Sequence, residues 1–152
     1  MENCYNWERN ILKFADKNEN KFNLKFKGDK TIVSGDSATG KTLICTLLSN
    51  ISKDKNKSLK PYNADNVFIL TDDNVEKLVD QKNKLIIIDR AEFILNDKIV
   101  DYINHDRENR YLLFLRKAMG IDLSPNHFAE LKKDNKDNET VLEYLFDIKG
   151  WY

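Results

Sequence analysis

The sequence predicts an α/β fold in which helices flank a central, mostly parallel sheet. Two uncharged and largely apolar runs, at 85–88 and 111–115, are typical of parallel strands buried on both faces. Segments with helical spacing of apolar residues, at 41–51 and 91–106, lie between them. This alternation favours right-handed crossovers within one parallel sheet, with helices on both faces. The chain has 152 residues, enough for one core, so we expect a single domain over 1–152.

The composition argues against several classes of function. Lys plus Arg number 25 and Asp plus Glu also 25, so net charge does not indicate nucleic acid or an acidic membrane as partner. No apolar run approaches about 18 residues, and the first residues lack the basic and apolar regions of a secretion signal. Cys4 and Cys45 lack the spacing of a zinc site or a disulfide framework. We therefore expect a reduced, cytoplasmic protein without a membrane partner.

The first third of the chain predicts short strands. The segments 11–15 and 22–26 are separated by a polar turn, and the second alternates apolar and polar residues. They predict an N-terminal antiparallel hairpin that leads into a third strand at 31–33. Tyr5 and Trp7 allow two interpretations, because aromatic rings can stack on an adenine or pack into a core or sheet edge.

The stretch GDSATGKT follows this third strand and is the most informative part of the sequence. Gly35 is followed after four residues by Gly40, Lys41 and Thr42, which open a helix. The glycines allow backbone N–H groups to converge on a phosphate, and the helix N-terminus adds partial positive charge. Lys41 can neutralise the β and γ phosphates, and the Thr42 hydroxyl can ligate Mg²⁺. The predicted nucleotide-binding residues are Gly35, Asp36, Ser37, Ala38, Thr39, Gly40, Lys41, Thr42 and Leu43. The alternative is a Gly-rich turn that binds nothing.

The helix predicted at 41–51 has one apolar face. Its apolar residues recur at i, i+3, i+4 and i+7, namely Ile44, Leu47, Leu48 and Ile51. The Lys-rich segment 52–66 contains Pro61 and predicts a solvated loop, with contact to phosphate or an acidic partner as the alternative. A strand at 67–70 and a short helix within 71–81 are expected next.

The apolar strand at 85–88 ends abruptly in Asp89. An acid at the carboxyl end of a central strand beside a phosphate-binding loop can hold the Mg²⁺ shell, and the alternative is a helix-capping Asp. Glu92 can orient an attacking water or be an ordinary acid in a first helical turn. Arg116 ends the next strand, so Lys41, Asp89 and Arg116 are all expected at one edge of the sheet.

The C-terminal part predicts a hairpin at the edge of the sheet, and the alternative is a helix that starts at Ser124 and Pro125. The arms of the hairpin are 127–133 and 140–146, separated by a polar turn. His105 and His127 lie in polar contexts, which favour surface or capping roles over catalysis.

Together, GDSATGKT and LIIID resemble the two nucleotide motifs of the P-loop NTPase superfamily. The apparent strands between the motifs, and the polar residue that ends the following strand, look most like the AAA-type branch of additional-strand ATPases. The resemblance covers about residues 22–116. It implies a three-layer P-loop NTPase fold, with ATP and Mg²⁺ bound across the carboxyl edge of the strands. It also implies catalytic roles for Lys41 and Asp89.

Two features differ from the AAA-type pattern. Arg90 follows Asp89 where such ATPases commonly carry a water-polarising acid, so Glu92 is the candidate for that task, and Asp36 within the loop is another. The resemblance places Arg116 in the sensor position that contacts the γ-phosphate or the attacking water. Too few residues follow Arg116 for the helical lid domain of these ATPases.

The sequence therefore predicts a small Mg²⁺-dependent ATP-binding protein with slow hydrolysis. It would act as a switch or accessory subunit for a protein partner or within a homo-oligomer. A small-molecule or nucleotide kinase is the first alternative, although the residues after Arg116 contain no Arg for a closing lid. The second alternative is an interaction module that binds nucleotide without hydrolysing it.

Overall fold

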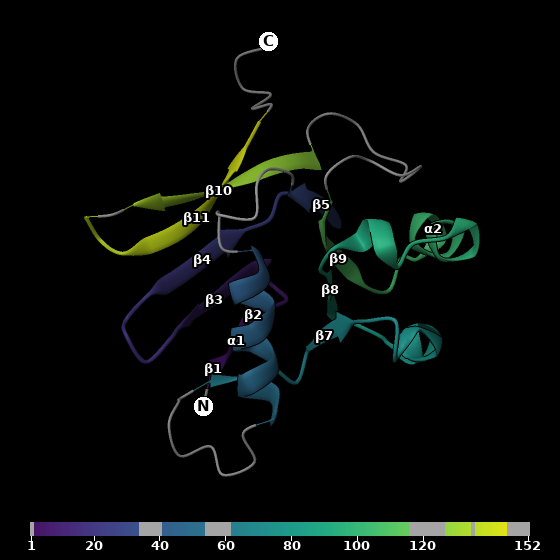
Figure 1. Ribbon diagram of the computed structural model, residues 1–152, viewed down its shortest axis with the longest axis horizontal. Helices are drawn as coiled ribbons and strands as arrows, with labels where there is room; N and C mark the ends of the chain where they lie inside the picture. Colours follow the sequence, from purple (N-terminus) through teal and green to yellow (C-terminus); the bar gives the residue numbers. More distant parts are fainter. Residues whose placement is uncertain (1, 34–40, 54–61, 116–126, 135, 146–152) are drawn as a thin grey trace.

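The protein is built around a nine-stranded mixed sheet (Figure 1). The computed structural model describes residues 2–33, 41–53, 62–115, 127–134 and 136–145. In spatial order the strands are β2 (Tyr5–Asn6), β3 (Ile11–Ala15), β4 (Lys21–Lys25), β11 (Glu139–Tyr144), β10 (Phe128–Asp134), β5 (Lys30–Val33), β9 (Arg110–Phe114), β8 (Leu85–Ile88) and β7 (Val67–Leu70).

The two halves of this sheet differ in strand direction. From β10 through β5, β9 and β8 to β7, every neighbouring pair is parallel. In the other half, β2, β3 and β4 are antiparallel neighbours, as are β10 and β11. The two halves join where β11 runs parallel to β4.

The two outer edges of the sheet approach each other. A separate parallel pair, β1 (Glu2–Asn3) with β6 (Tyr62–Asn63), lies where the chain enters the edge strands β2 and β7. The Cys4 N–H donates to the Asn63 carbonyl at 2.8 Å, and the Asn66 Nδ2 donates to the Tyr5 carbonyl at 2.6 Å. These contacts make the sheet nearly closed and barrel-like.

Helices cover two different faces of this curved sheet. Helix α1 (Lys41–Lys53) packs with apolar residues of both the antiparallel and the parallel strands, so it lies within the curve (Figure 1). The 3-10 helices η2 (Val75–Asp80) and η3 (Ala91–Phe93) and helix α2 (Asp97–His105) pack on the opposite face of the parallel strands. None of the helices in the described part of the chain is long and apolar enough to cross a membrane.

The predicted three-layer α/β fold is wrong. The sheet is mixed and nearly closed, and the described helices are short, with 13 residues in α1 and 9 in α2. The segment predicted as a helix within 71–81 forms only the six-residue 3-10 helix η2. So short a segment makes too few backbone hydrogen bonds to offset the free-energy cost of starting an α-helix.

The C-terminal hairpin accounts for much of this difference. Strands β10 and β11 pair antiparallel, but they lie inside the sheet and not at its edge, because β10 joins β5 and β11 joins β4. They thereby connect the N-terminal strands to the parallel half. Apolar periodicity identifies a strand but not its neighbours, since any strand edge offers the same backbone donors and acceptors.

Several individual elements are confirmed. The strands predicted at 67–70 and 85–88 are β7 and β8, and the helix predicted at 41–51 is α1, which continues to Lys53. All four residues of β8 are buried, as expected for a strand covered on both faces.

Candidate nucleotide-binding site

The strands that carry the two predicted motifs end at one edge of the sheet. Strand β9 lies between β5 and β8, and all three are parallel. Val33 pairs with Phe114, and Leu113 pairs with Ile88, so the three strands end within about one residue of each other. The carboxyl end of β5 and Asp89, which follows β8, therefore lie at the same edge of the sheet.

Part of the predicted site cannot be placed. Gly35, Asp36, Ser37, Ala38, Thr39, Gly40 and Arg116 lie outside the described residues, and so does the side chain of Thr42. The described part of the site consists of the first turns of α1 and the segment that follows β8.

Asp89 interacts electrostatically with helix α1. Burial raises the pKa of the Cys45 thiol, and the negative charge of Asp89 raises that pKa further. Cys45 is four residues after Lys41, which places the two residues on the same side of the helix one turn apart. The fold thus brings the predicted metal-binding acid to the helix that the predicted phosphate-binding loop precedes.

Lys41 is the first residue of α1 and is only 8% exposed. A buried ammonium group requires polar or charged partners. Both Lys41 and Asp89 take part in polar or electrostatic interactions within the protein. Leu43, in contrast, is 44% exposed, so its side chain does not contribute to the buried face of α1.

A tight turn follows Asp89. Arg90 has φ 51° and ψ 51°. These angles lie in the left-handed region, which residues other than glycine rarely adopt. The Phe93 N–H donates to the Arg90 carbonyl at 3.0 Å, and Ala91 is fully buried. The turn therefore reverses the chain directly after β8 and positions η3 beside the end of that strand.

Glu92 lies in η3 and is half-buried. Its Oε2 atom is buried and has no hydrogen-bond partner among the described residues. A buried carboxylate oxygen without a partner is costly, so a hydrogen-bond donor at this point would stabilise it. Glu92 also lies in the first turn of η3, so both interpretations of this residue stay open. The next residue, Phe93, is 80% exposed.

The aromatic residues considered for adenine stacking lie elsewhere. Tyr5 is fully buried, and Arg110 lies over the Trp7 ring with its Cζ 3.9 Å from the ring centroid. Arg110 is the first residue of β9, at the end of the strand opposite to the carboxyl edge. Stacking of Tyr5 or Trp7 on a base bound near Lys41 is therefore excluded.

The histidines are not placed as a catalytic pair. His105 is exposed, and its Nδ1 lies 2.8 Å from the Asp101 carbonyl oxygen. Burial lowers the pKa of His127, and the positive charge of Lys30 lowers it further. Within the described residues, no group of three or more His, Cys, Asp or Glu side chains could hold a metal ion.

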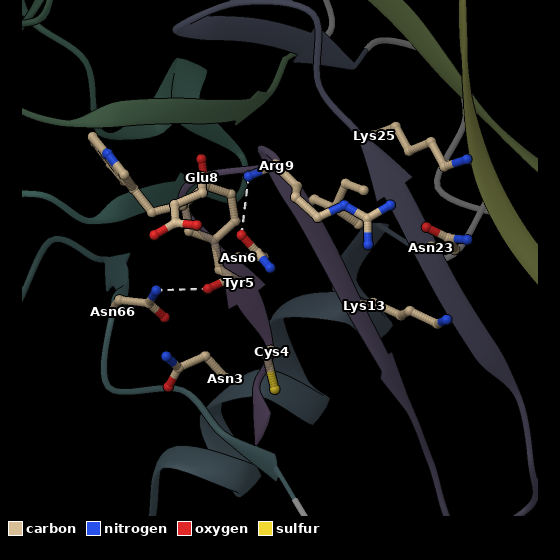
Figure 2. Close-up of a pocket in the computed structure, with 12 residues that line it drawn as sticks. Asn3, Cys4, Tyr5, Asn6, Glu8, Arg9, Lys13, Asn23, Lys25 and Asn66 are labelled. Carbon is tan, nitrogen blue, oxygen red and sulfur yellow. Dashed lines mark hydrogen bonds between the residues drawn. The ribbon is translucent and has the colours of Figure 1, made fainter. Parts of the chain in front are cut away.

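Two features of the structure were not predicted from the sequence. One is the proximity of Cys45 to Asp89, which only the packing of α1 against the sheet creates. The other is a polar cavity beside the N-terminal segment (Figure 2). In the sequence, only the exposed lysines of β3 and β4 pointed to this cavity. Exposed lysines are usually just solvated, so they did not predict it.

Comparison with protein-family models, curated proteins and solved structures found no match. Function is therefore inferred from the residues of this chain.

Proposed function

We propose that the protein binds ATP with Mg²⁺ at the carboxyl edge of β5, β9 and β8 and hydrolyses it slowly. The observation that carries this proposal is that β5 and β8, which precede the two motifs, end at the same edge of the sheet, where Asp89 interacts electrostatically with Cys45 of α1. The phosphate-binding loop pattern and the predicted metal-binding acid are far apart in the sequence. The strands that precede them end at one edge of the sheet, which supports a shared ligand.

Each residue of the site has a role in this proposal. The backbone of residues 35–40 and the N-terminus of α1 bind the phosphates, and Lys41 neutralises charge on their oxygens. Thr42 and Asp89 would hold Mg²⁺, and the half-exposed carboxylate of Asp89 at the end of a buried strand fits this task. The metal, when bound, would supply positive charge that offsets the charge of the phosphates.

Glu92 is the proposed water-orienting acid. Its buried Oε2 can accept a hydrogen bond from a water, and no described residue competes for it. Arg90 occupies the position next to Asp89, so no second acid adjoins the first. This arrangement supports a low rate of hydrolysis, suited to a switch or an accessory subunit. Arg116 stays the predicted sensor of the γ-phosphate.

The setting of the protein is also a proposal. Within the described residues, neither Cys4 nor Cys45 forms a disulfide and both are buried, which fits a reducing compartment such as the cytoplasm. Phe93 is 80% exposed beside the site, which supports contact with a protein partner or a second copy of the chain.

Phosphate release and thermal melting test the proposal. Lys41→Ala should abolish ATP hydrolysis, whereas Lys98→Ala, an exposed lysine of α2, should leave it unchanged. Saturation with ATP and Mg²⁺ at 100 times the Kd should stabilise the wild-type protein by about 2.7 kcal/mol. Equal phosphate release from wild type and Lys41→Ala would refute hydrolysis at this site, and no thermal shift would refute binding.

A further inference from the structure

Strand β10 joins the parallel half of the sheet through a short pairing with β5 (Figure 1). Among the described residues, two pairs form this connection, Phe128 with Ile32 and Ala129 with Val33. Four pairs connect β5 with β9, and six connect β10 with β11. The connection between β5 and β10, the β5–β10 joint, is therefore shorter than the connection on either side of it.

Tyr144 of β11 adds a side-chain contact across the joint. Its hydroxyl lies 2.8 Å from the Thr31 Oγ1 atom and accepts a hydrogen bond from the Lys27 N–H at 2.9 Å. Burial raises the pKa of the Tyr144 hydroxyl, so this group is uncharged throughout the range from about pH 5 to 8. The contact therefore does not respond to pH in this range.

His127 directly precedes β10 and lies at the same joint. A Cβ atom added to Gly28, two residues before β5, would lie 4.0 Å from the Nε2 atom of His127. The Nδ1 atom is buried and has no hydrogen-bond partner in the part of the chain that the structure describes. A neutral imidazole can carry its proton on Nε2, but an imidazolium carries a proton on both nitrogens. Protonation would thus bury an N–H group without an acceptor, which is costly.

Charged groups around His127 act in both directions. The positive charge of Lys30, the first residue of β5, opposes a positive charge on the ring. The carboxylate of Asp29 favours that charge, but the Arg110 Nε atom lies 3.7 Å from the Asp29 Oδ1 atom and offsets the effect. Burial of the ring and the charge of Lys30 prevail, and together they lower the pKa of His127. The closed joint therefore holds the neutral ring.

We propose that His127 is a pH-sensitive switch whose protonation opens the β5–β10 joint in mildly acidic solution. Separation of the two strands releases the ring from its buried position, so the open form binds the proton more readily. The stabilisation of the closed joint is complete above about pH 6.5, the ordinary pKa of histidine, and is lost as the pH falls below that value. The open form keeps the pairs of β5 with β9 and of β11 with β4, so the chain stays folded.

Amide hydrogen exchange followed by NMR tests this switch in the full chain. For wild type, the protection factors of the Ile32 and Ala129 amides should be at least about threefold lower at about pH 5.0 than at about pH 7.5, because opening follows proton binding. The protection factors of Ile86 and Ile87 in β8, away from the joint, should change less than about twofold.

Two variants assign the effect to His127. His127→Gln cannot titrate, so its Ile32 and Ala129 amides should have equal protection factors at the two pH values. His105→Gln replaces the other histidine, which is exposed on α2, and should behave like wild type. An NMR titration of the histidine ring signals of wild type is a measurement that depends on no variant, and His127 should titrate below about pH 6.5.

The proposal is overturned if wild type shows no loss of protection at Ile32 and Ala129 in acid, or if β8 loses protection to the same extent. It is also overturned if His127→Gln keeps the wild-type pH dependence, if His105→Gln removes it, or if His127 titrates at or above about pH 6.5. None of these measurements involves nucleotide, so their outcome is independent of the proposed ATP site.

Discussion

At the scale of single residues, the segment after β8 concentrates unusual chemistry. Arg90 has a left-handed backbone, Glu92 buries an oxygen without a partner in the described structure, and Phe93 is largely exposed. Such departures from the ordinary preferences of side chains and backbone occur often at functional sites. The segment directly follows Asp89, so the departures coincide with the site that the motifs predict.

Replacing Arg90 with glycine should stabilise the protein by about 1 kcal/mol. The side chain is exposed, so the change removes backbone strain without removing buried contacts. Asn83→Gly is the matched control, because Asn83 also has a positive φ of 56° but asparagine tolerates that conformation. Urea denaturation of both variants measures the difference. An Arg90→Gly protein no more stable than Asn83→Gly would show that Arg90 is not strained.

Glu92→Gln should lower the rate of ATP hydrolysis while leaving the Kd for ATP unchanged. The amide keeps the size of the side chain but removes the negative charge that can accept a proton from water, and a general base typically contributes about 10²-fold or more. Single-turnover hydrolysis and nucleotide binding measure the two effects separately. If hydrolysis is unchanged, the buried oxygen has only a structural role.

Cys45 should make the protein less stable at high pH. Its pKa in the folded protein is raised above the ordinary value of 9.0, so the folded state holds the proton more tightly than the unfolded state. Its contribution to stability is complete below about pH 9 and is lost as the pH rises above that value. Unfolding free energies measured from pH 7 to 10 should fall less steeply for Cys45→Ala than for wild type. Parallel pH profiles would contradict the shift.

At the scale of elements, local signals set the ends of the helices. Helix α2 begins at Asp97 because Asn96 has an extended backbone and its Oδ1 accepts a hydrogen bond from the Ile99 N–H at 2.9 Å. This contact satisfies one of the donors that a helix N-terminus leaves without an intrahelical partner.

Asn96→Ala should therefore cost about 1 kcal/mol of stability. The residue is exposed, so the loss reports the cap and not core packing. Lys98→Ala, two positions further on and also exposed, should change stability by less than about 0.5 kcal/mol. Thermal denaturation of the two variants distinguishes them, and equal stabilities would mean that the cap contributes nothing.

At the scale of the whole molecule, the N-terminal edge of the sheet is also attached to the interior of its parallel half. Arg110 at the start of β9 donates to the Tyr5 hydroxyl at 2.9 Å and to the Trp7 carbonyl, and its guanidinium lies over the Trp7 ring. These contacts attach the N-terminal segment to the parallel half of the sheet.

Arg110→Ala should destabilise the protein by about 2 kcal/mol, since it removes hydrogen bonds and a cation–π contact from a partly buried site. Arg107 is exposed and donates only to backbone carbonyls of nearby residues, so Arg107→Ala should cost less than about 0.5 kcal/mol. Chemical denaturation compares the two. Similar losses would show that Arg110 does not attach the N-terminal segment to the parallel half of the sheet.

The sequence by itself determined the helices and strands that depend on residues close together in the chain. Residues 85–88 could be recognised as a strand because four consecutive apolar residues require burial on both faces, and α1 could be recognised from its apolar spacing. The candidate site was proposed from the motif that precedes α1.

Only the tertiary structure decided how these elements meet. The pairing of β11 with β4, the approach of Asp89 to Cys45 and the cavity beside Arg9 all join residues far apart in the chain. Backbone hydrogen bonds are alike at every strand edge, so side-chain patterns do not specify which edges pair. The helix-flanked parallel sheet was predicted wrongly for this reason, because the two hairpins joined one sheet and curved it around α1.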